Sequence, residues 1–342
     1  MALKEIGFGV VGLGMGRNRC ELVSKTEGAV LRAVVDVNEE RAREVASNYG
    51  VDWYRDYSKL LARKDVDVVY VLTPSGLHAE MAVEAARAGK HVITTKPMCV
   101  SLKQADAMIR ECRRAKVKLA VDFESRYLPD MLRIRKWIDD GRFGKLILGE
   151  ARLKWYRSQE YYSTSGWRGT WRYDGGGSLM NQTVHLIDLL QWYMGPADSV
   201  TGRIGVFTHQ IETEDLGAAI INFKNGAVGT VLGTTTCPKD TAFRIEIHGD
   251  RGLVITEGNV LHLSHFLDGE ERTEEEFLAG KPRNVVEDMI RAIREDEEPL
   301  VTGEEGRKSV ELVLAIYQSS MSGKRVKLPL RKDLPFEYNE PP

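Results

Sequence analysis

The stretch Ile6-Gly-Phe-Gly-Val-Val-Gly12-Leu-Gly14-Met-Gly16-Arg17 decides how the first part of the chain folds. It is a short apolar run that ends in a glycine cluster, and a helical mix of residues follows it. Gly12 permits a tight turn between a strand and a helix, and Gly14 lets the backbone approach a pyrophosphate at the helix N-terminus. The third glycine of this fingerprint would fall at Arg17, whereas Gly16 comes one place early, so the fingerprint is incomplete.

Asp36 strengthens the interpretation of the glycine cluster as a dinucleotide site. It follows the second apolar run and lies 22 residues after Gly14. A carboxylate there can accept hydrogen bonds from an adenosine ribose and would repel a 2′-phosphate, which predicts NAD rather than NADP. Arg17 could contact a phosphate instead, which keeps NADP possible. For Asp36 alone, the alternative is a plain turn or N-cap residue.

Strand-like and helix-like segments alternate through the first third of the chain. Further apolar runs at 66–72, 91–94 and 119–123 are separated by segments of helical pattern. Alternation at this spacing predicts a parallel sheet with right-handed crossovers. We therefore predict an α/β Rossmann domain over residues 1–123, which binds NAD(P).

The remaining residues, 124–342, predict an α+β domain with a mostly antiparallel sheet. Strand follows strand from Ala197 to His265, with turns at Lys224-Asn225-Gly226 and at 249–252. An Asn-Gly pair between apolar runs is a strong hairpin signal. Helical patterns occupy 178–193, 284–295 and 304–322.

Composition excludes several classes of function. Among 342 residues, 48 are Lys or Arg and 50 are Asp or Glu, so the formal net charge is −2 and nucleic acid is not expected as the partner. No run of 18 apolar residues predicts a membrane span, and the N-terminus does not resemble a signal peptide. Four scattered cysteines without a CxxC pair indicate reduced thiols in a cytoplasmic protein and no zinc site.

Two further motifs complete a family pattern. The first is Thr73-Pro-Ser-Gly-Leu-His78 followed by Ala88-Gly-Lys-His-Val-Ile-Thr-Thr-Lys96-Pro97. The second is Trp167-Arg-Gly-Thr-Trp-Arg-Tyr-Asp-Gly-Gly-Gly-Ser-Leu-Met-Asn-Gln-Thr-Val-His185-Leu-Ile-Asp188. With the glycine cluster, these motifs resemble the glucose–fructose oxidoreductase / inositol dehydrogenase / rhizopine catabolism (Gfo/Idh/MocA) family almost from end to end.

This resemblance implies a nicotinamide cofactor and hydride transfer at a secondary carbinol of a sugar, sugar acid, nucleotide sugar or cyclitol. It also implies that the sheet of residues 124–342 is open and that this domain binds the substrate and mediates oligomerisation. A homodimer or homotetramer would form through this sheet, since an open sheet face is otherwise a liability. The stretch from Tyr161 to His185 is most similar to that of relatives that oxidise nucleotide-linked amino-sugar acids, and inositol or aldose dehydrogenases are compatible with it.

The resemblance assigns two catalytic residues, Lys96 and His185. Lys96 matches the lysine of a family Glu-Lys-Pro motif that orients the substrate hydroxyl and touches the cofactor, although Thr95 replaces the glutamate. His185 matches the histidine of an Asp-x-x-x-His motif and suits acid–base chemistry, because its ordinary pKa is about 6.5. A surface lysine and a packing histidine are the respective alternatives.

Other residues of the pattern carry open alternatives. Asn181 replaces the family aspartate and can bind a substrate hydroxyl, and Asp188 either orients the substrate or satisfies a neighbour. Arg126 and Tyr161 contact either the substrate or the protein itself. The remaining cofactor-binding candidates, beside Gly12, Gly14, Gly16 and Asp36, are Met15, Thr73, Pro74, His78, Trp167 and Arg168.

Two other functions stay open at this point. Some relatives hold NAD tightly and cleave glycosides through a transient oxidation and elimination, without net turnover of NAD. A non-catalytic NAD-binding regulator is a third class, but such a sensor needs neither a base nor a polarising lysine.

Overall fold

The computed structural model describes residues 5–269, 278, 280–331 and 333, which form two compact units. The first unit comprises the described residues of Met1–Cys99, Lys103–Phe123 and Pro282–Arg307. The second comprises those of Val100–Leu102, Glu124–Lys281 and Lys308–Pro342. Over the described part of the chain, none of the helices has both the length and the apolar character that crossing a bilayer requires.

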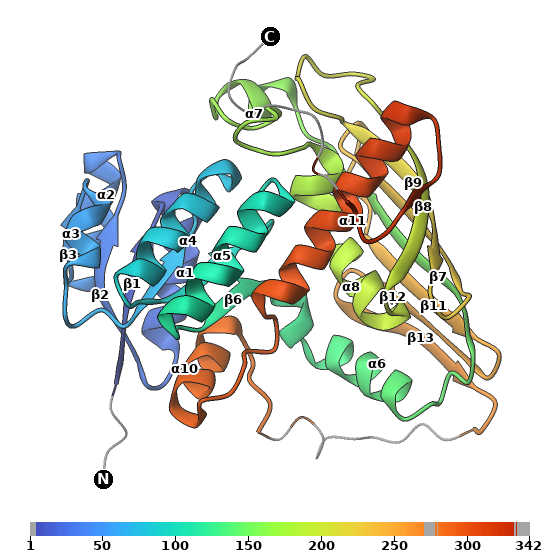
Figure 1. Ribbon diagram of the computed structural model, residues 1–342, viewed down its shortest axis with the longest axis horizontal. Coiled ribbons are helices and arrows are strands. Elements are labelled where there is room, and N and C mark those ends of the chain that lie inside the picture. Colours follow the sequence, from blue (N-terminus) through green and yellow to red (C-terminus); the bar gives the residue numbers. More distant parts are fainter. Residues whose placement is uncertain (1–4, 270–277, 279, 332, 334–342) are drawn as a thin grey trace. The chain divides into compact units, whose positions relative to one another are not determined.

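A parallel sheet forms the centre of the first unit (Figure 1). Its described strands run in the order β3-β2-β1-β4-β5-β6, each parallel to its neighbours, which is the Rossmann order. Their bounds are β1 Ile6–Val11, β2 Ala29–Val35, β3 Asp52–Tyr54, β4 Val68–Val71, β5 His91–Thr95 and β6 Leu119–Asp122. Every residue of β1 is buried, as expected for a strand covered on both faces. The predicted α/β class is confirmed.

Helices follow the strands of this unit in alternation. They are α1 Leu13–Lys25, α2 Glu39–Tyr49, α3 Tyr57–Leu61, a 3₁₀ turn Ser75–Leu77 (η1), α4 His78–Arg87 and α5 Leu102–Ala115. Asn38 caps α2, since its side chain accepts a hydrogen bond from the amide of Arg41. The cap identifies Asn38, not Asp36, as the residue that begins this helix.

One late segment of the chain packs with the first unit. Residues 282–307, which the sequence analysis placed in the second domain, contribute helix α10 (Val285–Glu295) and the stretch after it. The amide of Val121 donates to the carbonyl of Val301 at 2.9 Å, and Thr302 forms a bridge with Ala120. This stretch therefore extends the sheet edge beside β6, a long-range pairing that local sequence patterns do not encode.

The second unit is built on a mixed, mostly antiparallel sheet (Figure 1). Its described strands run in the order β13-β12-β11-β7-β10-β9-β8-β14, and only β7 and β10 pair in parallel. They are β7 Leu146–Lys154, β8 Ala197–Gly205, β9 Leu216–Phe223, β10 Val228–Thr234, β11 Arg244–Gly249, β12 Gly252–Glu257, β13 Val260–Phe266 and β14 Val326–Lys327. The predicted hairpin at Asn225-Gly226 joins β9 and β10 and is confirmed.

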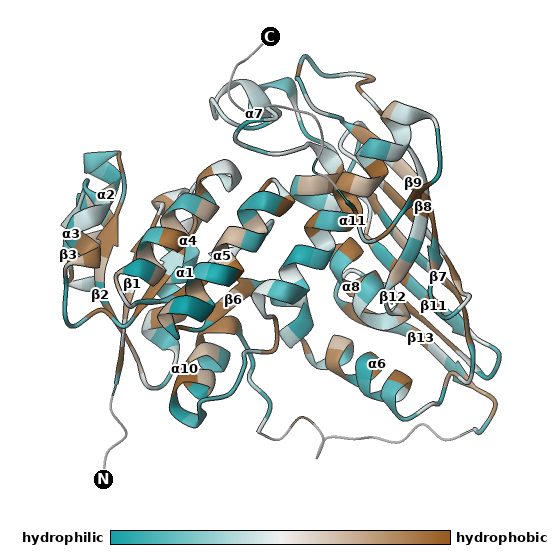
Figure 2. Cartoon of the chain, viewed as in Figure 1, coloured by the Kyte–Doolittle hydropathy of each residue, from teal (hydrophilic) through white to brown (hydrophobic). Residues whose placement is uncertain are grey.

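Helices of the second unit pack against one face of this sheet. They include α6 Pro129–Asp139 and α8 Val184–Met194. The unit also contains α7 Gln159–Ser163, a 3₁₀ turn Glu124–Tyr127 (η2) and the part of α11 (Gly303–Ser322) that belongs to it. Figure 2 shows mixed hydropathy on the strands of the second sheet, whereas the strands of the parallel sheet in the first unit are mainly hydrophobic. On the other face Ile220 is 54% exposed and Val228 39% exposed. That face therefore carries apolar side chains that this unit does not cover.

Candidate functional site

Gly12 forms the turn between β1 and α1, and Gly14, Met15 and Gly16 lie in the first turn of α1. Gly12 has a φ of +88°, and a Cβ there would lie 2.7 Å from the backbone of Leu72, so only glycine fits. A Cβ at Gly14 would meet nothing within 4 Å, which means that open space faces this point of the loop. Met15 is exposed beside it. The turn thus has the tight backbone and the free space that a pyrophosphate requires.

Asp36 is tied to this turn rather than left as a solvent-exposed residue. Its side chain is buried, and its carboxylate accepts hydrogen bonds from the amides of Leu13 at 2.7 Å and Asn38 at 2.8 Å. Arg41 lies 3.2 Å from the same carboxylate. Arg17 is paired with Glu44 through two hydrogen bonds of 3.0 and 2.6 Å. The negative charge at Asp36 and the pairing of Arg17 both favour NAD over NADP.

His78 joins the turns that follow β4 and β5. The ring is buried, with Nδ1 2.9 Å from the carbonyl oxygen of Pro97 and Nε2 2.7 Å from that of Thr73. The two carbonyls favour the charged ring, but burial outweighs them and lowers the pKa of His78. The neutral ring donates to one carbonyl at a time. His78 thus holds the backbone of both turns in place, and Pro74 lies in the first of them.

Lys96 comes directly after β5, at the carboxyl end of the parallel sheet, where α/β proteins bind their ligands. The residue is half-buried and its charge contributes to the lowered pKa of His78. Pro97, which follows it, has a cis peptide bond. Lys96 therefore belongs to the same carboxyl edge of the first unit as the glycine cluster and Asp36.

His185 belongs to the second unit, in the first turn of α8. The sequence predicts a continuous α-helix over 178–193, but residues Ser178–Thr183 (η3) form a π-helical segment that leads into α8. Short π segments are frequent at functional sites. His185 is half-buried, whereas Asp188 is fully buried.

Glu214 holds the start of this π segment. Its buried carboxylate accepts hydrogen bonds from the amides of Gly177 at 2.9 Å and Leu179 at 2.7 Å, and from the hydroxyl of Tyr317 at 2.9 Å. Burial raises the pKa of Glu214 to about 7. A Cβ at Gly177 would lie 1.8 Å from the Glu214 carbonyl oxygen, so the close approach requires glycine.

Asn181 and Tyr161 are linked by polar contacts within the second unit. The Asn181 side-chain nitrogen donates to the buried carboxylate of Asp174, and its oxygen accepts from Gln182 at 3.0 Å. Gln182 also donates to the hydroxyl of Tyr161 at 3.0 Å. The structure thus brings Tyr161 to the segment that precedes His185.

Arg126 and Asp188 pair with one another. Two hydrogen bonds of 2.7 Å join the guanidinium to the carboxylate, and the side chains are 3% and 1% exposed. Ser309 donates to the same carboxylate at 3.0 Å, and the Arg126 guanidinium lies 5.0 Å from the ring centroid of Trp192. Of the two alternatives left open for each residue, this geometry favours a role within the protein.

Trp167 and Arg168 lie in the loop after α7. The Arg168 guanidinium carbon is 4.3 Å from the ring centroid of Tyr161 and 5.2 Å from that of Trp167. The hydroxyl oxygen of Ser165 accepts a hydrogen bond from the Arg168 amide at 3.0 Å, which fixes the backbone. The Arg168 guanidinium thus contacts two aromatic rings. One of them, Tyr161, is hydrogen-bonded to Gln182, the residue next to Asn181.

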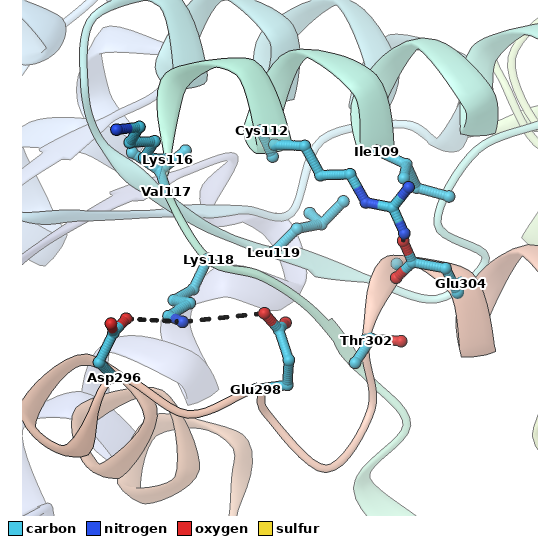
Figure 3. A pocket seen from close by; sticks show the side chains of 12 residues that line it. Ile109, Cys112, Lys116, Val117, Lys118, Leu119, Asp296, Glu298, Thr302 and Glu304 are labelled. Carbon is cyan, nitrogen blue, oxygen red and sulfur yellow. Dashed lines mark hydrogen bonds and ion pairs between the residues drawn. The ribbon is translucent and has the colours of Figure 1, made fainter.

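A cavity of about 520 Å³ lies elsewhere in the first unit (Figure 3). It is at the amino end of β6, whereas the glycine cluster and Lys96 lie at carboxyl ends of strands. Four of its charged groups form ion pairs with each other: Lys118 with Asp296 at 3.0 Å, and Arg113 with Glu304 at 2.5 Å. None of the residues predicted for the site lines it.

Sequence reasoning missed Glu214, Asp174 and Gln182. The first two are buried carboxylates that hold the segment bearing Asn181 and His185, and Gln182 links it to Tyr161. The available signal was weak: a Thr-Glu-Asp run just before the apolar strand β9, and an aspartate just before three glycines.

Two family models match most of the chain. Residues 6–123 match the oxidoreductase family with an NAD-binding Rossmann fold, and residues 131–255 match the GFO/IDH/MocA C-terminal domain.

Solved structures and curated proteins agree with these models. The WlbA dehydrogenase from Bordetella pertussis, crystallised with NADH and UDP-GlcNAcA, is 33% identical, with 96% of this chain and 99% of that chain covered and a TM-score of 0.88. Its counterpart from Chromobacterium violaceum, with the same ligands, is 32% identical, with coverages of 97% and 98% and a TM-score of 0.89. Myo-inositol 2-dehydrogenase of Thermotoga maritima is 26% identical, with coverages of 94% and 98%.

Proposed function

Because the chain belongs to the Gfo/Idh/MocA family of NAD-binding oxidoreductases, we propose that Lys96 and His185 carry out its dehydrogenation of a sugar-like secondary carbinol. The observation that carries the proposal is the placement of Lys96. It follows a strand at the same carboxyl edge that bears the glycine cluster and the buried Asp36. A cation at that edge can hold the oxygen of a carbinol.

Each of the two residues has one task in this chemistry. Acceptance of the hydride from the carbinol carbon is the chemistry that bound NAD would supply. The Lys96 ammonium donates a hydrogen bond to the substrate oxygen and orients it, and a ring nitrogen of His185 accepts the hydroxyl proton. Such positioned acid–base groups contribute roughly 10²–10⁴-fold to the rate.

The cofactor-binding residues that we propose lie in the first unit. The turn of Gly12, Gly14, Met15 and Gly16 would hold the pyrophosphate, and Asp36 would accept the adenosine ribose hydroxyls. Thr73, Pro74 and His78 form the neighbouring turn, whose backbone is held by the His78 ring. The fit is supported by the open space at Gly14 and by the buried, hydrogen-bonded Asp36 carboxylate. NADP is the less favoured cofactor because Asp36 would repel its extra phosphate.

We propose a nucleotide-linked sugar acid as the substrate. Support comes from the stretch of Tyr161 to His185, which is similar to that of relatives acting on such compounds. The WlbA structures, at 33% and 32% identity over nearly the whole chain, were crystallised with UDP-GlcNAcA. Asn181 would contact a substrate hydroxyl, with its orientation set by Asp174.

A homodimer or homotetramer through the exposed face of the second sheet is also proposed. Ile220 on β9, Val228 on β10 and Leu148 on β7 are all at least 39% exposed, and the strand register places them on one face of the sheet. Burying such side chains against a second copy would remove apolar surface from water. Light scattering of the wild type and of an Ile220→Lys variant tests this: the variant should shift toward monomer. A cytoplasmic location is also proposed, since none of the four cysteines, all of them described, forms a disulfide.

The decisive assay for the proposed function follows NAD reduction at 340 nm with UDP-GlcNAcA, myo-inositol and neutral aldoses. Wild type, Lys96→Ala and His185→Ala are compared, with NADH binding measured separately by fluorescence. Both substitutions should lower kcat by at least about 10²-fold while NADH still binds. Turnover that survives both substitutions would overturn the assignment of the two residues. Bound NAD without net reduction would instead direct the search to the glycoside-cleaving relatives.

A further inference from the structure

The guanidinium of Arg168 stands apart from the other partly buried arginines of the chain. Its Nε is buried without a hydrogen-bond partner among the described residues. Four other arginines also have a buried nitrogen of this kind, but each forms an ion pair with a carboxylate. They are Arg32 with Glu5, Arg142 with Asp268, Arg244 with Glu246 and Arg291 with Asp288. Arg168 forms no ion pair with any carboxylate that the structure describes.

The loop holds this cation in a fixed position. The ring centroids of Tyr161 and Trp167 lie 4.3 and 5.2 Å from its guanidinium carbon. On the backbone, the Arg168 amide donates to the Ser165 hydroxyl, and the Thr170 hydroxyl donates to the carbonyl of Trp167 at 2.6 Å. A guanidinium that is already ordered loses little entropy when it binds a ligand.

A half-buried cation without an acidic partner is costly, and a bound anion would remove that cost. Aromatic rings leave the edge of a stacked guanidinium available, and its parallel N–H groups match the two oxygens of a carboxylate or a phosphate. The hydroxyl of Tyr161 accepts from Gln182, three residues before His185. The cation is therefore connected to the segment that presents the proposed base.

We propose that Arg168 binds the carboxylate or phosphate group of an anionic sugar substrate, with Tyr161 and Trp167 holding its guanidinium in place. This inference rests on the proposed function, and it identifies the residue that selects charged over neutral sugars. The cofactor-binding role that the family resemblance implies for Arg168 is the competing assignment. Both assignments use the same chemistry, a guanidinium on an oxyanion, so the experiment has to separate the two anions.

The experiment measures dissociation constants by titration calorimetry for wild type, Arg168→Gln and Arg168→Lys. The ligands are UDP-GlcNAcA, UDP-GlcNAc, which lacks the carboxylate, the free N-acetylglucosaminuronate, which lacks the diphosphate, and NADH. Arg157→Gln is the matched control, since Arg157 also lies over the Tyr161 ring, at 5.5 Å, and over Trp155, at 4.9 Å, but has an acidic neighbour, Asp240, at 3.5 Å. Thermal melting of each variant verifies that it is folded.

Arg168→Gln should raise the dissociation constant of UDP-GlcNAcA about 10- to 100-fold, as the loss of a charge-assisted bidentate contact predicts. The dissociation constant of NADH should change less than about threefold. Arg168→Lys should recover only part of the lost affinity, and Arg157→Gln should change the affinity for neither UDP-GlcNAcA nor NADH. If Arg168→Gln also loses affinity for UDP-GlcNAc, the phosphate is the group that Arg168 binds. If it also loses affinity for the free acid, the carboxylate is that group.

Three results would overturn the proposal. Arg168→Gln could bind NADH more weakly with unchanged affinity for the sugars, it could bind every ligand as the wild type does, or the wild type could bind none of the anionic sugars. Failure of the proposed function looks different. In that case the wild type binds UDP-GlcNAcA in an Arg168-dependent way but does not reduce NAD with it.

Discussion

The two units hold their proposed site residues by different physical means. In the first unit, Gly12, Asp36 and Lys96 lie within one or two positions of a strand end, and the sheet edge itself brings them together. In the second unit, the segment bearing Asn181 and His185 depends on buried carboxylates, of which Glu214 comes from the turn before a strand, far along the chain. A further buried ion pair, between Arg126 and Asp188, anchors α8.

This difference has a consequence for substitutions. In the first unit, a changed side chain at the strand ends should alter ligand affinity more than folding, because the strands are held by their own apolar burial. In the second unit, the same charged groups position the site and stabilise the fold. Changes there should reduce stability and activity together.

The largest effect should come from Arg126→Ala. Removing one partner leaves the Asp188 carboxylate buried without its cation, which should cost about 3–5 kcal/mol of unfolding free energy. Urea denaturation followed by tryptophan fluorescence measures this cost. Replacing both partners, Arg126→Met with Asp188→Leu, should recover most of it. Lys136→Ala, which breaks the exposed pair with Asp140, is the control and should cost less than about 1 kcal/mol. A stable Arg126→Ala variant with a raised KM would instead indicate substrate contact.

Glu214→Gln should change how stability depends on pH. Burial raises the pKa of Glu214 from 4.5 to about 7, so the folded state favours the protonated carboxyl. The stability that this group contributes is complete below pH 4.5 and is lost as the pH rises through 7. The difference in unfolding free energy between wild type and Glu214→Gln should therefore change by roughly 3 kcal/mol across that interval, with the wild type relatively more stable in acid.

Tyr317→Phe sharpens the Glu214 experiment. The Tyr317 hydroxyl donates to the carboxylate and lowers its pKa, so removing that hydroxyl should move the transition to higher pH. Identical pH dependence in wild type and Glu214→Gln would show that another group titrates in this interval.

In the first unit, Asp36→Ser should act mainly on the choice of cofactor. Loss of the carboxylate removes the repulsion of a 2′-phosphate and releases Arg41, so the preference for NADH over NADPH should fall by about tenfold or more. Fluorescence titration with the two reduced cofactors measures the ratio. Stability should fall by only about 1 kcal/mol, since the lost contacts are hydrogen bonds at a turn. An unchanged ratio would mean that Asp36 only braces the loop.

The smallest effect should come from Glu44→Gln, which releases Arg17 without touching Asp36. Both side chains are about half exposed, so the pair should contribute less than about 1 kcal/mol to stability. NADPH affinity should change less than about threefold, because Asp36 still repels the phosphate. An increase of tenfold in the same titration would identify Arg17 as the phosphate contact that its position in the sequence leaves possible.

Much of the fold could be predicted from sequence wherever the signals are local. The apolar run before Gly12, the cap at Asn38 and the hairpin at Asn225-Gly226 each depend on neighbouring residues, and all three are found in the structure. The π segment at Ser178–Thr183 was not predicted. Its residues have the pattern of an ordinary amphipathic helix. The amides of Gly177 and Leu179, at the start of the segment, donate to the carboxylate of the distant Glu214, and the local sequence does not indicate this contact.

By itself, the amino-acid sequence indicated the alternating strands and helices of the Rossmann domain, the strand-rich second half, the family and a preference for NAD, because each of these depends on motifs whose residues lie a short distance apart along the chain. Only the tertiary structure decided that residues 282–307 pack with the first unit and that Arg126 and Asp188 pair with each other. It also decided that Arg168 has two aromatic neighbours and no ion pair with a carboxylate among the described residues. These features depend on which groups become buried together, and burial follows from the folded arrangement of distant segments, not from any local pattern.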